Sequence, residues 1–202
     1  PPSWCMGGRL ATQASIEPDW RHWHCQWSGG ASCQHPDRGP AGYTGVASVQ
    51  AGLGGARFST SVDLSNTYLD WYRENLAING LSDQKHRAVR SDVFTWLKQE
   101  TGEYDLILLD PPTFSNTKST STDFDVQRDH EQLVKLTMDR LSQNGVLYFS
   151  NNNRRFELAR ALLEAYQVDD ITDATLGPDF ARSPHIHQCW RFTHIDGISD
   201  TN

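Results

Sequence analysis

The residues with the clearest chemical use form a short turn in the middle of the chain, Asp110-Pro111-Pro112-Thr113-Phe114. The turn directly follows an apolar run with the pattern of a strand buried on both faces, Leu106-Ile107-Leu108-Leu109. Two prolines fix φ and remove two backbone donors, so the Asp110 carboxylate and nearby carbonyls make a site rich in acceptors. Such a site suits the amine or amide edge of a base, and Phe114 offers a face for stacking. A simple proline turn is the alternative, but it leaves Asp110 without a purpose.

Two more carboxylates follow predicted strands. Asp63 lies in Ser61-Val62-Asp63-Leu64-Ser65, and Asp92 lies in Ser91-Asp92-Val93. Asp63 could accept both hydroxyls of a ribose, and Asp92 could accept the exocyclic amine of adenine. Each could instead cap a helix. Ser65 or Asn66 could cap in place of Asp63, which would leave that carboxylate freer.

Hydrophobic periodicity predicts the elements that position these residues. From Tyr43 onward strands and helices alternate, which indicates βαβ units and a mainly parallel sheet. In such sheets ligands bind beyond the carboxyl ends of the strands. The predicted strands span 57–62, 86–90, 106–109, 145–150, 168–172 and 188–193, and the predicted helices span 47–53, 67–79, 93–99, 126–141 and 156–166.

Together these motifs and their spacing resemble the Rossmann-like class I methyltransferases. The runs 110–116, 124–130 and 149–152 are more specific. They resemble the C-terminal domain of the bacterial bifunctional 23S rRNA methyltransferase K/L family, over about Tyr43 to Thr193. The resemblance implies S-adenosylmethionine (AdoMet) as methyl donor and N7 of a guanine in 23S rRNA as acceptor. It implies an α/β fold with a mainly parallel seven-stranded sheet whose first strand is missing or aberrant here.

The resemblance also implies site residues. Those expected to bind the cofactor are Tyr43, Thr44, Gly45, Asp63, Leu64, Asp92, Val93 and Asp110, and those expected to act on the base are Asp110, Pro111, Pro112 and Phe114. Basic residues near the expected mouth favour phosphate contacts with RNA over a merely solvated surface, namely Lys118, Arg128, Arg154, Arg155 and Arg182. We expect no metal.

Residues 1–41 differ from the rest of the chain. They hold four of the seven Trp and three of the four Cys, but one Leu, one Ile and no Val. A zinc site from His22, His24, Cys25, Cys33 and His35 has none of the usual ligand spacings. We expect an aberrant or disordered segment, such as an out-of-frame translation, which does not supply the apolar first strand. The methyltransferase domain is predicted to span 42–202.

Composition sets broad limits. The chain has 202 residues, enough for one domain with a real core, and its net charge of −7 argues mildly against nucleic acid. No apolar run reaches eighteen residues and no signal peptide is visible, so we expect no membrane. The absence of an initiator Met suggests a fragment. Few and scattered cysteines indicate a reducing compartment, and we expect a cytoplasmic protein.

Other functions remain open within and outside this class. An Asp-Pro-Pro turn with an aromatic residue would also suit N2 of guanine or N6 of adenine. The alternative from another class is a truncated, inactive domain that only binds RNA or a partner. Methylation of cytosine C5 needs a cysteine nucleophile. The sole cysteine of the matching region, Cys189, is predicted on the last strand and away from the turn, so we expect no C5 chemistry. A dehydrogenase is disfavoured because no Gly-x-Gly-x-x-Gly follows a strand.

Overall fold

The computed structural model describes residues 45–115, 123–176 and 187–195. Its helices are α2 (Val46–Leu53), α3 (Asn66–Ile78), α4 (Val93–Gln99), α5 (Val126–Met138), α6 (Arg160–Ala165) and α7 (Thr172–Thr175). Its strands are β1 (Ser59–Asp63), β2 (His86–Arg90), β3 (Tyr104–Leu109), β4 (Phe114–Ser115), β5 (Phe124–Asp125), β6 (Leu141–Asn151), β7 (Gln167–Asp170) and β8 (Gln188–Thr193). The segment 1–41, its candidate zinc ligands, and residues Tyr43, Thr44, Lys118 and Arg182 lie outside the described ranges.

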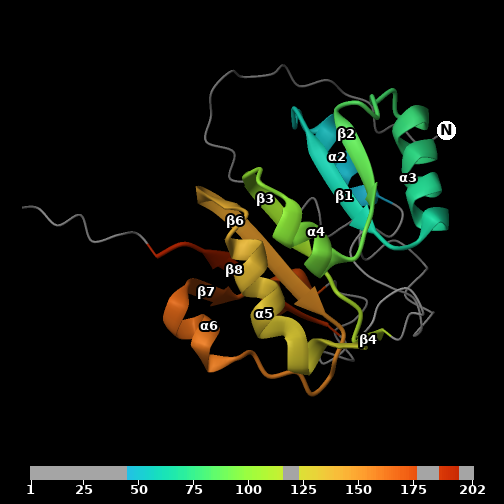
Figure 1. Cartoon of the computed structure of the whole chain (residues 1–202). Coiled ribbons are helices and arrows are strands. Elements are labelled where there is room, and N and C mark those ends of the chain that lie inside the picture. The colour runs from blue at the N-terminus through green and yellow to red at the C-terminus, as the bar shows by residue number, and fades with distance from the viewer. Residues whose placement is uncertain (1–44, 116–122, 177–186, 196–202) are drawn as a thin grey trace, which may run out of the picture.

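Two groups of strands lie side by side in Figure 1. The strands β1 and β2 form a parallel pair, while the other sheet has the order β3-β6-β8-β7. In the second sheet β3 and β6 are parallel, and β8 is antiparallel to both β6 and β7. The short strands β4 and β5 form an antiparallel pair between the Asp-Pro-Pro turn and α5. This α/β arrangement follows from the predicted alternation of strands and helices.

The main core lies between the four-stranded sheet and α5. Helix α5 runs across the near face of this sheet in Figure 1, with α4 and α6 beside it. The core residues from α5 and the sheet that have no exposed surface include Val126, Leu133, Val134, Leu147, Phe149 and Phe192. A smaller core under α2 and α3 is built from Val49, Tyr72 and Leu76. Burial of these apolar faces is the main force that holds the helices on the sheet.

Glycine 45 is required where it lies, at the N-cap of α2. Its φ is +70°, in the left-handed region, and a Cβ there would come 1.9 Å from Cδ2 of Tyr72. Tyr72 has no exposed surface, so its ring cannot easily move away. The predicted Tyr-Thr-Gly turn thus ends on a position that only glycine fits.

Element boundaries differ from the prediction where tertiary contacts decide them. The helix predicted to reach Leu141 ends at Met138, because Leu141 already pairs with Tyr104 of β3. The helix predicted from Phe156 begins only at Arg160. The strand predicted over 168–172 ends at Asp170, whose side chain accepts from the Thr172 amide and starts the unpredicted α7.

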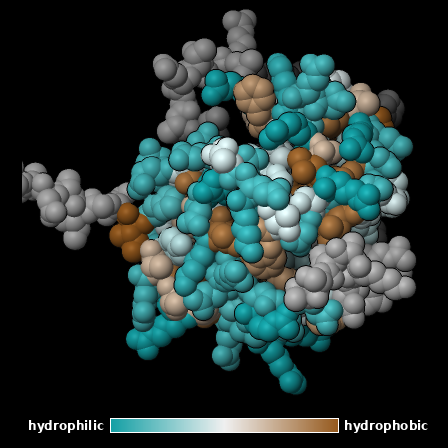
Figure 2. Space-filling view, in the orientation of Figure 1, coloured by the Kyte–Doolittle hydropathy of each residue, from teal (hydrophilic) through white to brown (hydrophobic). Residues whose placement is uncertain are grey.

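The surface of the face shown in Figure 1 is largely hydrophilic. In Figure 2 apolar side chains emerge on this face in separate small areas among hydrophilic ones. None of the helices within the described ranges combines the length and the apolar character needed to cross a bilayer.

β1 pairs with β2 along one edge, and β3 pairs with β6 along one edge. The other edge of each strand forms no ladder with a strand of the described ranges. At one end, the gap between them is bridged by side chains: the Tyr104 hydroxyl donates to Thr60 Oγ1 at 3.4 Å, and Arg87 lies 3.8 Å from Glu100. Within a βαβ unit, α2 should follow a strand that pairs with β1. A strand between β1 and β3 would satisfy the backbone groups along both edges.

We predict that an apolar strand placed directly before Tyr43, in exchange for residues 34–40, will raise the melting temperature. Each buried backbone group that gains a partner contributes about 1–3 kcal/mol, so a full ladder should be easily detected. Thermal unfolding followed by circular dichroism measures the effect. A Gly/Ser segment of equal length is the control. Equal melting temperatures for the original chain and the apolar variant, with a lower one for the control, would show that residues 34–40 already supply this strand. Three equal melting temperatures would show that a strand at this position adds no stability.

Candidate active site

Polar residues gather at the carboxyl ends of β1, β2, β3 and β6, whose arrowheads point the same way in Figure 1. Asp63 ends β1 and is only 2% exposed. Its Oδ1 accepts from the Ser65 amide at 2.7 Å, and Ser65 in turn caps α3 by accepting from the Tyr68 amide. Of the two caps that the sequence left open in place of Asp63, Ser65 and Asn66, the structure shows Ser65. Leu64 follows Asp63 and is partly buried.

Asp92 follows β2 and caps α4. Its Oδ1 accepts from the amide of Thr95 at 2.9 Å and from the Thr95 hydroxyl at 3.1 Å. The sequence left open whether Asp92 caps a helix or binds a ligand, and the structure shows the cap. A carboxylate has two oxygens, so a cap through Oδ1 is compatible with a ligand contact through Oδ2. Val93 begins α4 and packs against the main core.

Asp110 comes directly after β3, as predicted. Its Oδ1 accepts a hydrogen bond from the Ser150 hydroxyl at 2.9 Å, and Ser150 is completely buried. Burial raises the pKa of the Asp110 carboxyl from 3.8 to about 6, and the hydrogen bond from Ser150 opposes this rise. The carboxyl therefore loses its proton near pH 6 and is mainly ionised at neutral pH. Pro111 is buried and Pro112 partly buried, so the turn is held firmly.

Cys189 lies next to this site, nearer than the sequence predicted. It pairs with Ser150 across β6 and β8, and the Asp110 charge acts on its thiol. Burial, together with that charge, raises the pKa of Cys189 to about 12. A thiol that keeps its proton at neutral pH is a poor nucleophile. Cys189 lies on the last strand, as predicted, and its burial and raised pKa support the expectation that it does no C5 chemistry.

Phe114 lies on β4, pairs with Asp125 of β5 and is 54% exposed. The exposed ring is open to a planar ligand. One residue later the described range ends at Ser115, and it resumes at Asp123. The Val126 amide donates to the Thr113 carbonyl at 3.1 Å, which fixes the start of α5 against the Asp-Pro-Pro turn.

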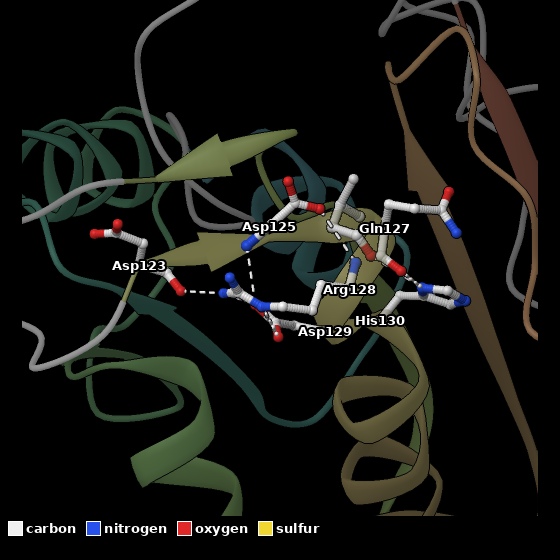
Figure 3. A network of polar contacts seen from close by, with 7 residues as sticks. Asp123, Asp125, Gln127, Arg128, Asp129 and His130 are labelled. Atoms are coloured by element: carbon white, nitrogen blue, oxygen red, sulfur yellow. Dashed lines mark hydrogen bonds and ion pairs between the residues drawn. The ribbon is translucent and has the colours of Figure 1, made fainter.

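A polar network surrounds the start of α5 (Figure 3). Asp125 caps the helix by accepting from the Arg128 amide at 3.1 Å, and its own amide donates to Asp129. The Arg128 guanidinium donates to both carboxylate oxygens of Asp129 and to the Asp123 carbonyl. The hydrogen bond from Arg128 lowers the pKa of the Asp129 carboxyl. Arg128, expected to contact RNA, is thus exposed, and its charge is paired with that of Asp129.

The same helix holds the loop that follows β6. The Gln127 side chain binds both the carbonyl and the amide of Glu157, each at 2.9 Å. His130 Nε2 accepts from the Ala159 amide at 2.9 Å. Its Nδ1 therefore carries the proton and donates to the carbonyls of Val126 and Gln127, and Figure 3 shows the bond to Gln127. A helix from Phe156 would have used the Glu157 carbonyl, which instead accepts from Gln127. Together with the extended backbone of Ala159, this explains why α6 begins only at Arg160.

Arg154 and Arg155, also expected to contact RNA, lie in this loop and are exposed. Two Asx-type turns shape the loop, because Asn151 Oδ1 accepts from the Asn153 amide and Asn153 Oδ1 accepts from the Arg155 amide. The loop comes from the strand end beside Asp110. Both arginines therefore lie at the edge of the sheet where the candidate site residues gather.

Sequence reasoning assigned no role to Ser150, Gln127 or His130. Ser150 was part of the run that carried the family resemblance, but its partner could be found only from the pairing of β3 with β6. Gln127 and His130 lie one turn apart at the start of an amphipathic helix, a spacing that indicates a shared helix face. That spacing does not reveal the backbone groups they bind.

Two shallow hollows in the described surface lie away from Asp110, one along α5 near Glu131 and Lys135 and one near Gln143 and His194. Both are open and lined mainly by exposed side chains. Among the residues that the structure describes, no group of three or more His, Cys, Asp or Glu is placed to hold a metal ion. The polar cluster at the strand ends remains the candidate site.

Known proteins similar to this chain are methyltransferases. No model of a protein family matches it. Over 151 residues, 75% of this chain, it is 60% identical to the ribosomal RNA large subunit methyltransferase K/L of Ectopseudomonas mendocina. It is 58% identical over 151 residues to the protein of that name from Pseudomonas aeruginosa, and 52% over 156 residues to that of Acinetobacter baumannii. The chain is homologous to a part of these methyltransferases. It spans about a fifth of their length, 21% in each of the three.

Solved structures agree on the fold. The methyltransferase SMU.776, solved as a complex with SAH, is 25% identical, with a TM-score of 0.58 over 74% of this chain and 42% of that one. The SAM-dependent methyltransferase of Agrobacterium tumefaciens is 21% identical, with a TM-score of 0.54 over 75% of this chain and 53% of that one. These similarities confirm the predicted Rossmann-like methyltransferase fold.

We predict that Asp110→Asn stabilises the chain at pH 7.5 more than at pH 5. Because burial raises the pKa of Asp110 from 3.8 to about 6, ionisation costs folding free energy that builds up between these pH values and is complete above them. The full cost of the shift is at most about 3 kcal/mol, and about half of it is already present at pH 5. Partial exposure reduces the remainder, so the difference between the two pH values should be about 1 kcal/mol. Asparagine can still accept from Ser150.

Thermal unfolding at the two pH values measures this effect. Asp105→Asn is the matched control, because Asp105 lies on the same strand and accepts from Ser142 at 2.9 Å, but is exposed. An Asp110→Asn variant with the same gain, or none, at both pH values would contradict the raised pKa.

Proposed function

We propose that this chain is an AdoMet-dependent methyltransferase domain that modifies a guanine of 23S rRNA, with N7 as the favoured acceptor. One observation carries the proposal: a partly buried, ionisable carboxyl at the Asp-Pro-Pro turn of a methyltransferase fold, in a chain homologous to part of methyltransferase K/L. The exposed Phe114 ring and the two arginines after β6 support it, since they offer stacking and phosphate contacts.

Residues at the ends of β1 and β2 would hold the methyl donor. These hydrogen-bond acceptors fit the adenosine part of AdoMet, because buried Asp63 can accept from ribose hydroxyls and Asp92 can accept from the adenine amine. Leu64 and Val93 would line the adenine, and the Tyr43-Thr44-Gly45 turn would hold the methionine part. When bound, AdoMet supplies a methyl group activated by a sulfonium centre.

Guanine N7 needs no base to remove a proton, since it has a lone pair in neutral guanine. Catalysis would then rest on positioning N7 in line with the methyl group. Asp110, ionised at neutral pH, would accept from the Watson–Crick edge of the guanine and stabilise the positive charge that develops on the ring. Phe114 would stack on the base, while Pro111 and Pro112 keep the turn rigid.

RNA would be held at the rim of this site. Arg154 and Arg155 are exposed on the loop that Gln127 and His130 fix to α5. Arg128 can contribute only if a phosphate competes with Asp129 for its guanidinium. Lys118 and Arg182 complete the proposed set. Contacts of this kind add affinity without reading sequence.

Three alternatives can be separated from this function by experiment. An acidic Pro-Pro turn with an aromatic residue also suits N2 of guanine, which analysis of the modified nucleosides would separate from N7. N6-methyladenine in that analysis would point to an adenine instead. A domain that only binds RNA need not bind AdoMet, so a lack of AdoMet binding by calorimetry would favour that alternative.

We predict that Asp63→Ala weakens AdoMet binding by about 1.5–3 kcal/mol, the range for hydrogen bonds to charged groups. Isothermal titration calorimetry measures the affinity. Asp70→Ala is the control, because Asp70 lies on the exposed side of α3 and pairs with Arg73. Since Asp63 also accepts from the Ser65 amide, Asp63→Asn separates lost binding from a disturbed turn. Unchanged affinity in folded Asp63→Ala would rule out the ribose role.

We predict that Asp110→Ala lowers the rate of methyl transfer by about 100-fold or more and changes AdoMet affinity by no more than a few fold. The reason is that Asp110 would act on the base and on the charge it develops. Transfer of a labelled methyl group to 23S rRNA measures the rate, and calorimetry measures the affinity. A parallel fall of both quantities would place the turn in the cofactor pocket instead.

A further inference from the structure

Three polar or titratable side chains form a row across the ends of three neighbouring strands. Asp110 follows the last residue of β3 that pairs with β6, Ser150 lies beside it on β6, and Cys189 pairs with Ser150 from β8. The Ser150 hydroxyl is 2.9 Å from Asp110 Oδ1. Because neighbouring strands carry paired residues on the same face, the row is fixed by the backbone ladder and needs no flexible loop.

We propose that Ser150 is the positioning residue of this site: its hydroxyl holds Asp110 Oδ1 so that Oδ2 accepts from the base, and it keeps the carboxyl ionised at neutral pH. The catalytic consequence rests on the proposed function. The effect on the Asp110 carboxyl itself depends only on the two side chains.

Several observations support a role beyond packing. Ser150 has no exposed surface, and a buried hydroxyl must find a partner. Its partner is a carboxylate, which makes the hydrogen bond stronger than one between neutral groups. The hydroxyl donates to the ionised form, so it favours loss of the Asp110 proton against the effect of burial.

The other described groups around the row do not favour the ionised form of Asp110 as the Ser150 hydroxyl does. Cys189 faces the row from β8, but its buried thiol keeps its proton and carries no positive charge. Asp170 of β7 acts on Cys189 with a negative charge. Thr175 of α7 binds His187 Nε2 at 3.2 Å and the Thr172 carbonyl. Among the described residues, burial and the Ser150 hydroxyl are the resolved influences on the Asp110 carboxyl.

The chain contains a matched control for this pair. At the other end of the same two strands, Ser142 donates to Asp105 Oδ1 at 2.9 Å, the same separation as in the Ser150–Asp110 pair. That pair is exposed to solvent and lies away from the candidate site. Ser142→Ala thus removes a second serine from the same strand without touching the candidate site.

The test follows the Asp110 carboxyl by carbon-detected NMR of the full chain labelled with [¹³C]aspartate, with Asp110→Asn used to assign the signal. In Ser150→Ala we expect the pKa of Asp110 to rise by about one pH unit or more, as loss of a charge-assisted hydrogen bond implies. Ser142→Ala should leave it unchanged. An unchanged pKa of Asp110 in Ser150→Ala would overturn the proposal.

Activity provides a second readout. The acid limb of the rate profile for methyl transfer should move to higher pH in Ser150→Ala, while AdoMet affinity stays within a few fold of the original. Ser150→Thr keeps the hydroxyl and should restore the original profile. If Ser150→Ala does not fold, Ser150→Cys keeps a side chain of similar size with a weaker donor, and the same rise in the pKa of Asp110 is expected.

Failure of the proposal and failure of the proposed function are distinguishable. A chain without methyl transfer, but with the expected rise in the pKa of Asp110, would reject the function and keep the pairing. If methyl transfer occurs, and the acid limb and the pKa of Asp110 are the same in Ser150→Ala as in the original chain, the function is kept and the role of Ser150 is rejected.

Discussion

The parallel ladder between β3 and β6 brings Asp110 and Ser150 out of the sheet side by side. Without this pairing, an aspartate after an apolar strand would be solvated and would ionise at its ordinary pKa. With it, the carboxyl lies against the sheet, where burial raises its pKa to about 6 and a buried hydroxyl limits the rise. The rigid turn made by Pro111 and Pro112 then prevents the chain from carrying Asp110 away. The chemistry of the candidate site thus depends first on backbone hydrogen bonds between two strands.

Helix α5 organises the other half of the site. Its first turn binds the Asp-Pro-Pro turn through the Val126 amide and the loop after β6 through Gln127 and His130. The rings of Phe149 and Phe156 pack against His130, and Trp190 packs against both of these rings, which anchors the arrangement in the core. One helix end therefore fixes both the proposed base-binding turn and the loop that carries Arg154 and Arg155.

The edges of β1 and β3 that have no partner strand in the described ranges affect both the stability of the fold and the geometry of the site. β1 carries Asp63 and β3 leads to Asp110, so a strand between them would set the distance between the proposed cofactor and base sites. In the described ranges, side chains such as Tyr104 and Thr60 connect the two parts at one end. The opposite end is where the proposed ligands meet, and there a shared strand would be most useful for holding the geometry.

The sequence by itself determined the order and type of most elements, because their apolar periodicity reflects which face is buried. It also determined where the candidate residues lie: Asp63, Asp92 and Asp110 each follow a strand, as predicted, and Gly45 occupies a position that only glycine fits. It could not determine the ends of α5 and α6, since pairing of Leu141 with Tyr104 and binding of the 157–159 backbone by α5 side chains decide them. Only the tertiary structure placed Ser150 beside Asp110 and Cys189 beside Ser150. Such neighbours come from strands far apart in the chain, and the register that joins them depends on packing across the whole sheet, which no local pattern records.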